Sequence, residues 1–381
     1  MRTDRLAAIV GVAESDLGVT PNKTVLQLQA QAIKAALDDA GLEKKDIDAL
    51  FVAGNWSWSP NLVLAEYLGI QPRFSDGTNV GGSSFEFHIG HAVAGIRAGL
   101  FEVAVIAYGS TQRSDRSRNQ PQPFALLTEQ FERPYGMPMP VGAYALAATR
   151  HMHQYGTTSE QLAEIAVATR KWAVLNEKAF KREPMSIDDV LNSRWIAEPL
   201  HLLDCCLVTD GGGAVIVAAP HRAANARKKP IWILGHGETH THYGITNMPD
   251  LTVTGAVDSG RTAFAMAGVK HDDLDVVEVY DSFTITVLLT LEALGFCKRG
   301  EGGAFVSQQR TAPGGAFPLN TNGGGLSYCH PGMYGIFLLI EATRQLRGEC
   351  GARQVPDANL ALAHGTGGVL SSASTVILGR D

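Results

Sequence analysis

Residues 78–108 read TNVGGSSFEFHIGHAVAGIRAGLFEVAVIAY, and this stretch decides the fold. It predicts a glycine-rich turn, a helix through Ala98, a stop at Gly99 and an apolar strand from Val103 to Tyr108. A turn at a buried helix N-terminus suits acyl transfer, because the free N–H groups and the helix dipole stabilise negative charge there. This turn offers only glycines and serines.

The motifs NVGGSS, AGIRAG and VAVIAYGS resemble the nucleophile region of the thiolase superfamily, specifically the sterol-carrier-protein (lipid-transfer) type thiolases. The resemblance implies an acyl-accepting cysteine at the helix start. That position falls on Gly82 here, or on Ser83 if the match slips by one residue, and neither is a thiol. The chain therefore resembles a sterol-carrier-type thiolase that lacks its nucleophilic cysteine.

Composition indicates a globular enzyme with 381 residues, 45% of them hydrophobic and 18% charged. A net charge of −6 without a basic stripe excludes nucleic acid as an expected partner. No apolar run approaches the ~20 residues of a membrane span, and the short run Leu6–Val12 predicts a first strand rather than a signal peptide. Five cysteines without framework or metal-ligand spacing predict a reducing, cytoplasmic setting.

The pattern of elements repeats along the chain. A helix opening at Thr24 and a strand at 47–53 precede the quoted stretch, and helical segments within 110–200 predict an insertion that forms a lid or binding loops. The order glycine-rich turn, helix, stop and strand then recurs at 321–363. We predict two halves, 1–225 with the insertion and 226–381. The resemblance implies an α/β thiolase-like fold, with stacked mixed sheets in two duplicated halves and a helical loop-domain insertion.

Two histidines are candidate catalytic residues. His330 lies in NGGGLSYCHPGMYG, which resembles the family's asparagine-glycine-glycine and histidine-proline motif, where the histidine helps to hold the thioester oxygen. An imidazole can donate a hydrogen bond to an enolate or accept a proton near neutral pH. His364, in AHGTGG, falls where sterol-carrier-type members tend to have a histidine. The alternative for both is a structural role in a cap or a turn.

Tyr280 and Asp281 follow a predicted buried strand, in EVYDSF. The matching segment in sterol-carrier-type thiolases commonly reads His-Asp-Cys-Phe, so Asp281 is kept and Tyr280 replaces a histidine. A phenol is a good proton donor to an alkoxide or enolate, although a buried structural tyrosine is equally compatible with the pattern. We include Asp281 among the catalytic residues, as an orienting acceptor. The predicted substrate-binding residues are Gly82, Ser83, Asn322, Gly367 and Tyr243.

Other patterns point to chemistry less directly. Ser83 and Ser84 lack the G-x-S-x-G elbow of a serine nucleophile, and helix capping accounts for them. The histidines of GHGETHTHYG, residues 235–244, lack a supporting cysteine or carboxylate cluster, so no metal site is expected. Cys205 and Cys206 are most simply small apolar residues.

The resemblance implies three functions. The first is retro-aldol cleavage of a 3-hydroxyacyl-CoA, as in thiolase relatives that cleave sterol side chains with a small OB-fold and zinc-ribbon companion protein. The second is a sterol-carrier-type acyltransferase whose thiol comes from elsewhere, for example from Cys329. The third is a non-catalytic lipid or acyl-CoA binding subunit. Coenzyme A is expected as part of the substrate, without a covalently bound cofactor, and a homodimer is expected through the strand that follows the quoted helix.

Overall fold

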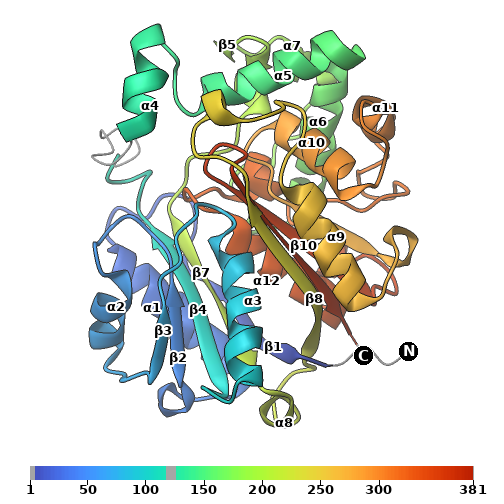
Figure 1. Ribbon diagram of the computed structural model, residues 1–381. Coiled ribbons are helices and arrows are strands. Elements are labelled where there is room, and N and C mark those ends of the chain that lie inside the picture. Colours follow the sequence, from blue (N-terminus) through green and yellow to red (C-terminus); the bar gives the residue numbers. More distant parts are fainter. Residues whose placement is uncertain (1–4, 117–125, 381) are drawn as a thin grey trace.

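The structure is a computed structural model and describes residues 5–116 and 126–380. Their longer strands form one mixed sheet of nine, drawn in Figure 1. In spatial order these are β3 (Phe74–Asp76), β2 (Ala49–Val52), β4 (Val103–Ser110), β7 (Gly211–Ala218), β1 (Ala7–Glu14), β8 (Ile231–His240), β11 (Ser372–Gly379), β10 (Leu360–Gly367) and β9 (Val276–Val279). A small hairpin of β5 (Trp195–Ala197) and β6 (Leu200–His201) stands apart.

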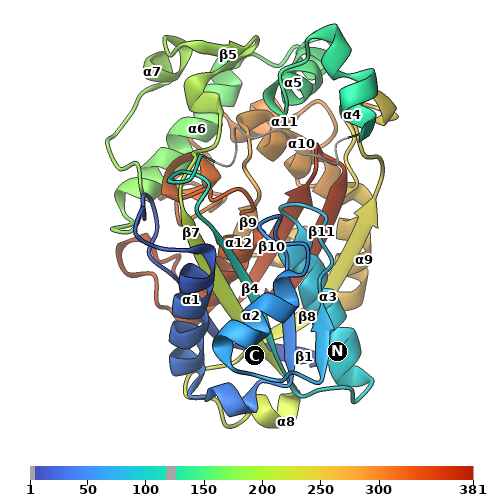
Figure 2. The same cartoon turned by 90° about the vertical axis from the view of Figure 1, so that its left-hand side faces the viewer.

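The two halves of the sheet meet at β1, which pairs antiparallel with β7 and with β8. Helices α3 (Ser84–Arg97) and α12 (Gly335–Arg347) contact each other, and both contact strands from each half. Figures 1 and 2 show these two helices between the two arms of the sheet. The predicted thiolase-like α/β fold is confirmed, and each of the two predicted halves contributes one helix to the layer between the arms.

Helices cover the outer faces of both arms. On the first arm these are α1 (Val25–Ala40) and α2 (Pro60–Leu68), and on the second α9 (Ala256–Ala267) and α10 (Thr284–Leu294). The short helix α8 (Pro220–Ala223) lies at the bottom of Figure 1, beyond the strand ends. Thr24 begins α1 with a capping box, since its side chain accepts the Gln27 N–H at 3.3 Å. Gly41 ends α1 with φ +74°, a left-handed conformation that favours glycine.

The predicted helical insertion is present. It contains α4 (Leu126–Phe131), α5 (Val141–Tyr155), α6 (Ser159–Val174) and α7 (Ile187–Leu191), which lie at the top of Figure 1 near α11 (Gly302–Val306). Residues 117–125 of the insertion lie outside the described part. The boundary between halves at residue 225 stays a prediction.

The predicted dimer contact through β4 stays a prediction, but it cannot be a backbone pairing between strands. β4 pairs with β2 on one side and with β7 on the other, so its backbone groups are already used. The edge strands of the nine-stranded sheet are β3 on this arm and β9 on the other, and a second sheet would have to pair at such an edge. Among the described residues, no helix is long and apolar enough to cross a membrane.

Candidate active site

A cavity of about 1400 Å³ lies where β4 and β9 end, and α5 contributes Tyr144 to its wall. Tyr108 lines it from β4, and Tyr280 lines it from the residue directly after β9. The cavity brings together five of the residues predicted from the sequence: Gly82, Tyr243, Tyr280, His330 and Gly367.

Tyr280 and His330 form a buried pair at this wall. The Tyr280 hydroxyl lies 2.8 Å from His330 Nε2, and the two rings are nearly perpendicular, with 82° between their planes. The Tyr334 N–H donates to Tyr280 Oη at 3.1 Å, directly before the first residue of α12. Burial raises the pKa of Tyr280 well above its usual range, so the phenol is neutral and can donate its proton.

His330 is fixed through its own backbone. Its N–H donates to Thr209 Oγ1 at 3.0 Å, and its carbonyl oxygen accepts from Gln112 Nε2 at 2.8 Å. These bonds connect the histidine-proline motif to segments before β7 and after β4, which leaves the imidazole to face Tyr280. The prediction that both residues belong to one site therefore agrees with their positions.

Gly82 lies directly beneath Tyr280. A Cβ atom at position 82 would lie 2.2 Å from Tyr280 Cε2 and 2.6 Å from the Thr366 carbonyl oxygen. Ordinary contacts between carbon atoms begin at about 3.5 Å, so no side chain fits at residue 82 while Tyr280 keeps its place. The tyrosine ring occupies the space in which the resemblance implies a cysteine side chain.

The two serines of the turn make local hydrogen bonds. Ser83 is buried and does not line the cavity, and its Oγ lies 2.7 Å from Ser372 Oγ. Ser84 Oγ donates to the Gly81 carbonyl oxygen at 2.6 Å and accepts the Val80 N–H at 2.9 Å. The serines therefore stabilise the turn, and the predicted capping of the helix is wrong, since neither hydroxyl bonds a helical N–H. Ser83 stands behind the cavity wall instead of at the predicted substrate position.

Asp281 and Asn322 also lie behind the wall. Asp281 accepts the N–H groups of Gly325 at 2.6 Å and Leu326 at 3.1 Å, and burial raises its pKa to about 7. Asn322 Oδ1 accepts the Tyr334 hydroxyl at 2.8 Å. Asp281 thus holds the glycine turn against the end of β9, and Asn322 links this turn to the residue before α12. Neither side chain lines the cavity.

His364 has a similar position. It is 1% exposed, its Nδ1 lies 2.8 Å from Thr375 Oγ1, and burial lowers its pKa to about 3. It does not line the cavity, but its carbonyl oxygen accepts the Tyr280 N–H at 2.9 Å. His364 therefore supports Tyr280 through the backbone. Because its side chain does not line the cavity, it is not placed to make the predicted direct contact with a substrate.

The cysteines differ in their access to the cavity. Cys329 is fully buried outside it, and burial raises the pKa of its thiol well above the usual range. A buried, protonated thiol is a poor nucleophile. Cys206 does line the cavity, together with Trp56, Tyr108 and Tyr144, none of which sequence reasoning singled out as a site residue. The only available signal was that Trp56 and Tyr108 lie at or just after predicted strand ends.

The three histidines of residues 235–244 are separated. His236 lies against Gly90, His240 packs its ring on Phe87 with centroids 5.0 Å apart, and His242 Nε2 lies 2.9 Å from the Val369 carbonyl oxygen. Within residues 5–116 and 126–380, no group of three His, Cys, Asp or Glu side chains could hold a metal ion.

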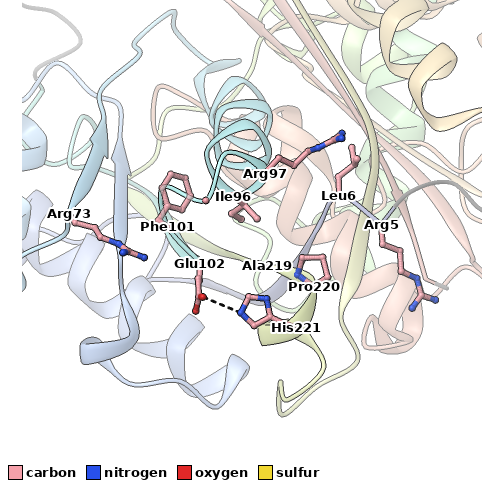
Figure 3. A pocket seen from close by; sticks show the side chains of 11 residues that line it. Arg5, Leu6, Arg73, Ile96, Arg97, Phe101, Glu102, Ala219, Pro220 and His221 are labelled. Atoms are coloured by element: carbon pink, nitrogen blue, oxygen red, sulfur yellow. Dashed lines mark ion pairs between the residues drawn. The ribbon is translucent and has the colours of Figure 1, made fainter.

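A second cavity, of about 620 Å³, lies at the opposite end of β4 (Figure 3). Its lining includes Leu6 and Phe101, together with Glu102 and His221, which form an ion pair of 3.2 Å drawn as a dashed line in Figure 3. Arg5 and Arg97 stand on separate walls with their guanidinium groups turned apart. The two cavities are separated by the length of β4, and none of the predicted site residues lines the second.

Comparisons with known proteins identify the family of the chain. Residues 237–380 match the family model described as thiolase C-terminal domain-like. The steroid side-chain-cleaving aldolase of Thermomonospora curvata is 34% identical, with 98% of each chain covered. The 17-hydroxy-3-oxo-4-pregnene-20-carboxyl-CoA lyase of Mycobacterium tuberculosis is 35% identical over 90% of this chain and 92% of its own. The chain therefore belongs to the thiolase superfamily.

Structural similarity points to one group within the thiolase superfamily. The solved Ltp2-ChsH2(DUF35) aldolase superposes with a TM-score of 0.90 at 33% identity, with 98% of each chain covered. The relatives that match nearly the full length thus include proteins that bear aldolase and lyase names. This chain is similar to the thiolase-like side-chain-cleaving aldolases.

Proposed function

We propose that this chain is a carbon–carbon lyase that cleaves a 3-hydroxyacyl-CoA thioester by a retro-aldol reaction, in the degradation of a side chain. The aldolase and lyase relatives support the reaction class. One observation of the structure carries it: the ring of Tyr280 fills the volume that a nucleophilic side chain at residue 82 would need. Cleavage must then proceed by proton transfer, without an acyl-enzyme at this position.

The proposed reaction balances without an added oxidant or reductant. The 3-hydroxyl group loses its proton, the bond between C2 and C3 breaks, and the C3 oxygen becomes the carbonyl of the released aldehyde or ketone. The electron pair moves to C2 and the thioester oxygen as an enolate. A proton returned to C2 gives the shortened acyl-CoA, so the proton taken from the hydroxyl group is replaced at carbon.

Tyr280 and His330 share the acid and base work in this proposal. The neutral phenol is a proton donor, and His330 Nε2, 2.8 Å away, can accept that proton and return it. Negative charge on Tyr280 Oη is stabilised by the Tyr334 N–H and by the N-terminal end of α12. His364 and Asp281 orient the pair, while Gly82, Gly367 and Tyr243 contact the substrate.

We also propose a companion protein, a homodimer and a cytoplasmic setting. The Ltp2-ChsH2(DUF35) aldolase supports a companion, and so does the charge of the cavity. Coenzyme A carries several phosphate charges, yet among the described residues that line the cavity Lys23 is the one lysine or arginine. A second chain would supply further cations. No disulfide joins the five cysteines, which all lie in the described part of the chain, and this is consistent with a reducing compartment.

Product analysis tests the proposal. The purified chain, with and without a companion subunit, is given a 3-hydroxyacyl-CoA and, separately, a 3-ketoacyl-CoA with free coenzyme A. Release of an aldehyde or ketone from the first substrate supports the lyase. His330→Ala should lower this activity about 100-fold or more if the imidazole transfers the proton. Replacement of an exposed histidine, His153→Ala on α5, is the matched control and should have no effect.

An acyltransferase is the second candidate, and Cys206 is the observation that favours it, because this thiol lines the cavity. Release of acyl-CoA only from the 3-ketoacyl-CoA would support this function, and Cys206→Ser should then abolish it. No product from either substrate would favour the non-catalytic binding role.

A further inference from the structure

Glu86 is a buried carboxyl group that the proposed chemistry does not use. It lies on α3, one helical turn after Gly82, and is completely buried. Neither of its oxygens has a hydrogen-bond partner among the described residues. Buried polar groups nearly always have partners, and strained or unsatisfied groups gather at functional sites, so Glu86 requires an explanation.

The chain makes room for this carboxyl group with two glycines. A Cβ atom at Gly335 would lie 2.4 Å from Glu86 Oε2, and a Cβ atom at Gly365 would lie 2.3 Å from the same oxygen. Gly335 is the first residue of α12, and Gly365 belongs to β10. Any other residue at either position would displace the Glu86 side chain.

The same tip of α12 holds the reacting residues. The Gly335 N–H donates to the Gly82 carbonyl oxygen at 3.2 Å, and the preceding Tyr334 N–H donates to Tyr280 Oη at 3.1 Å. Glu86 therefore contacts the residue next to the one that binds the Tyr280 hydroxyl. A charge on Glu86 would change the electrostatic potential at Tyr280, because both groups are buried at the N-terminal end of α12.

Within residues 5–116 and 126–380, no hydrogen-bonded cation balances a charge on Glu86. Burial raises the pKa of Glu86 well above its usual range. Tyr334 directly precedes α12, which carries Glu341, Arg344 and Arg347, and β10 carries His364. Arg344 pairs with Glu14, and Arg347 pairs with Asp39. Tyr334 bonds Asn322, Glu341 pairs with Arg353, and His364 bonds Thr375.

We propose that Glu86 is a positioning residue that stays neutral, so that the N-terminal end of α12 stabilises only the negative charge that the reaction creates. This inference rests on the proposed lyase function. An ionised Glu86 would place a second negative charge near Tyr280 and the enolate, and like charges at one site oppose each other. Ionisation of Glu86 at alkaline pH would then inhibit the enzyme.

Glu86→Gln tests this inference, because glutamine has the shape of the neutral acid and cannot ionise. In the infrared difference spectrum between the wild type and this variant, without substrate, we expect the carbonyl band of a protonated carboxyl group. A carboxylate band at neutral pH in its place would overturn the inference. This spectrum needs no turnover, so it decides the state of Glu86 even if the chain proves to have no lyase activity.

The pH profile of cleavage tests whether ionisation of Glu86 inhibits the enzyme. The cleavage rate of Glu86→Gln should stay within about threefold of the wild-type rate at neutral pH. The alkaline limb of its pH–rate profile should lie at a pH higher by about one unit or more. An unchanged alkaline limb, or a large loss of rate at every pH, would overturn the proposal. Glu66→Gln on the exposed face of α2 is the matched control. Glu86→Met is also uncharged, and its pH–rate profile is measured instead if the glutamine variant does not fold.

Discussion

Gly82→Ala is the substitution whose effect the structure defines most sharply. The added Cβ atom would lie 2.2 Å from Tyr280 Cε2, while carbon atoms normally approach no closer than about 3.5 Å. The Tyr280 ring must therefore move by roughly 1 Å. The new methyl group cannot shift toward Thr366 instead, because the Thr366 carbonyl oxygen already lies 2.6 Å from it. A single methyl group thus displaces the hydroxyl that bonds His330.

The expected cost follows from that displacement. A misplacement of about 1 Å in a catalytic group costs on the order of 100-fold in rate. Overpacking of this kind also lowers the free energy of unfolding by about 1–3 kcal/mol. Steady-state rates on a 3-hydroxyacyl-CoA and urea unfolding measure the two effects separately, so loss of activity can be distinguished from loss of folded protein.

A control and a double-mutant cycle complete the test. Gly99→Asn lies at the other end of the same helix, where no atom stands within 4 Å of an added Cβ and asparagine tolerates the left-handed backbone, so it should leave activity unchanged. In a Tyr280→Ala background, Gly82→Ala should lose most of its additional effect, because the two substitutions share one contact. Full wild-type activity in Gly82→Ala would refute the reasoning, since it would mean that Tyr280 does not need the space above residue 82.

Three further outcomes are expected. Tyr280→Phe should lower the cleavage rate about 100-fold or more without unfolding the chain, because it removes only the hydroxyl that His330 and Tyr334 bind; equal rates would exclude the phenol. Cys329→Ala should leave kcat unchanged in the same assay, because the buried thiol does not reach the cavity, and a large loss would reinstate it as a nucleophile. His91 pairs with Asp76 and Glu238, and the Asp76 carboxylate, together with Glu238, raises the pKa of His91 to about 9. The pairing should therefore add up to about 1 kcal/mol of stability that is complete below the usual histidine pKa of about 6.5 and disappears above pH 9. Urea unfolding against pH should show this loss, and His91→Gln should remove the pH dependence.

The sequence predicted the elements better than the side-chain directions. The helix that opens at Thr24 and the repeated turn and helix at 78–108 and 321–363 are local patterns, and the structure contains them. Motifs also placed Tyr280 and His330 at one site. Their contact could not be measured from the sequence, since 50 residues separate them and the fold alone closes the distance to 2.8 Å.

The predictions that differ from the structure have physical causes. Strand order determines which backbone edge is free, and sequence patterns do not contain it, so the expected dimer contact through β4 did not account for the pairing of β4 with β2 and β7. A motif indicates which segment lies near a site but not which side chain faces it. The motifs therefore could not show that the side chains of His364 and Asn322 lie behind the cavity wall. Glu86 was missed because a lone glutamate on an apolar helix carries no periodic signal.

The central claim is that a carbon–carbon bond breaks without a covalent intermediate on the protein. The most direct measurement quenches the enzyme during turnover of a 3-hydroxyacyl-CoA, then determines both products and the intact mass of the chain. We predict equal amounts of the carbonyl product and the shortened acyl-CoA, with the protein mass unchanged throughout. A mass increase equal to an acyl group, appearing and decaying at the rate of turnover, would contradict the account.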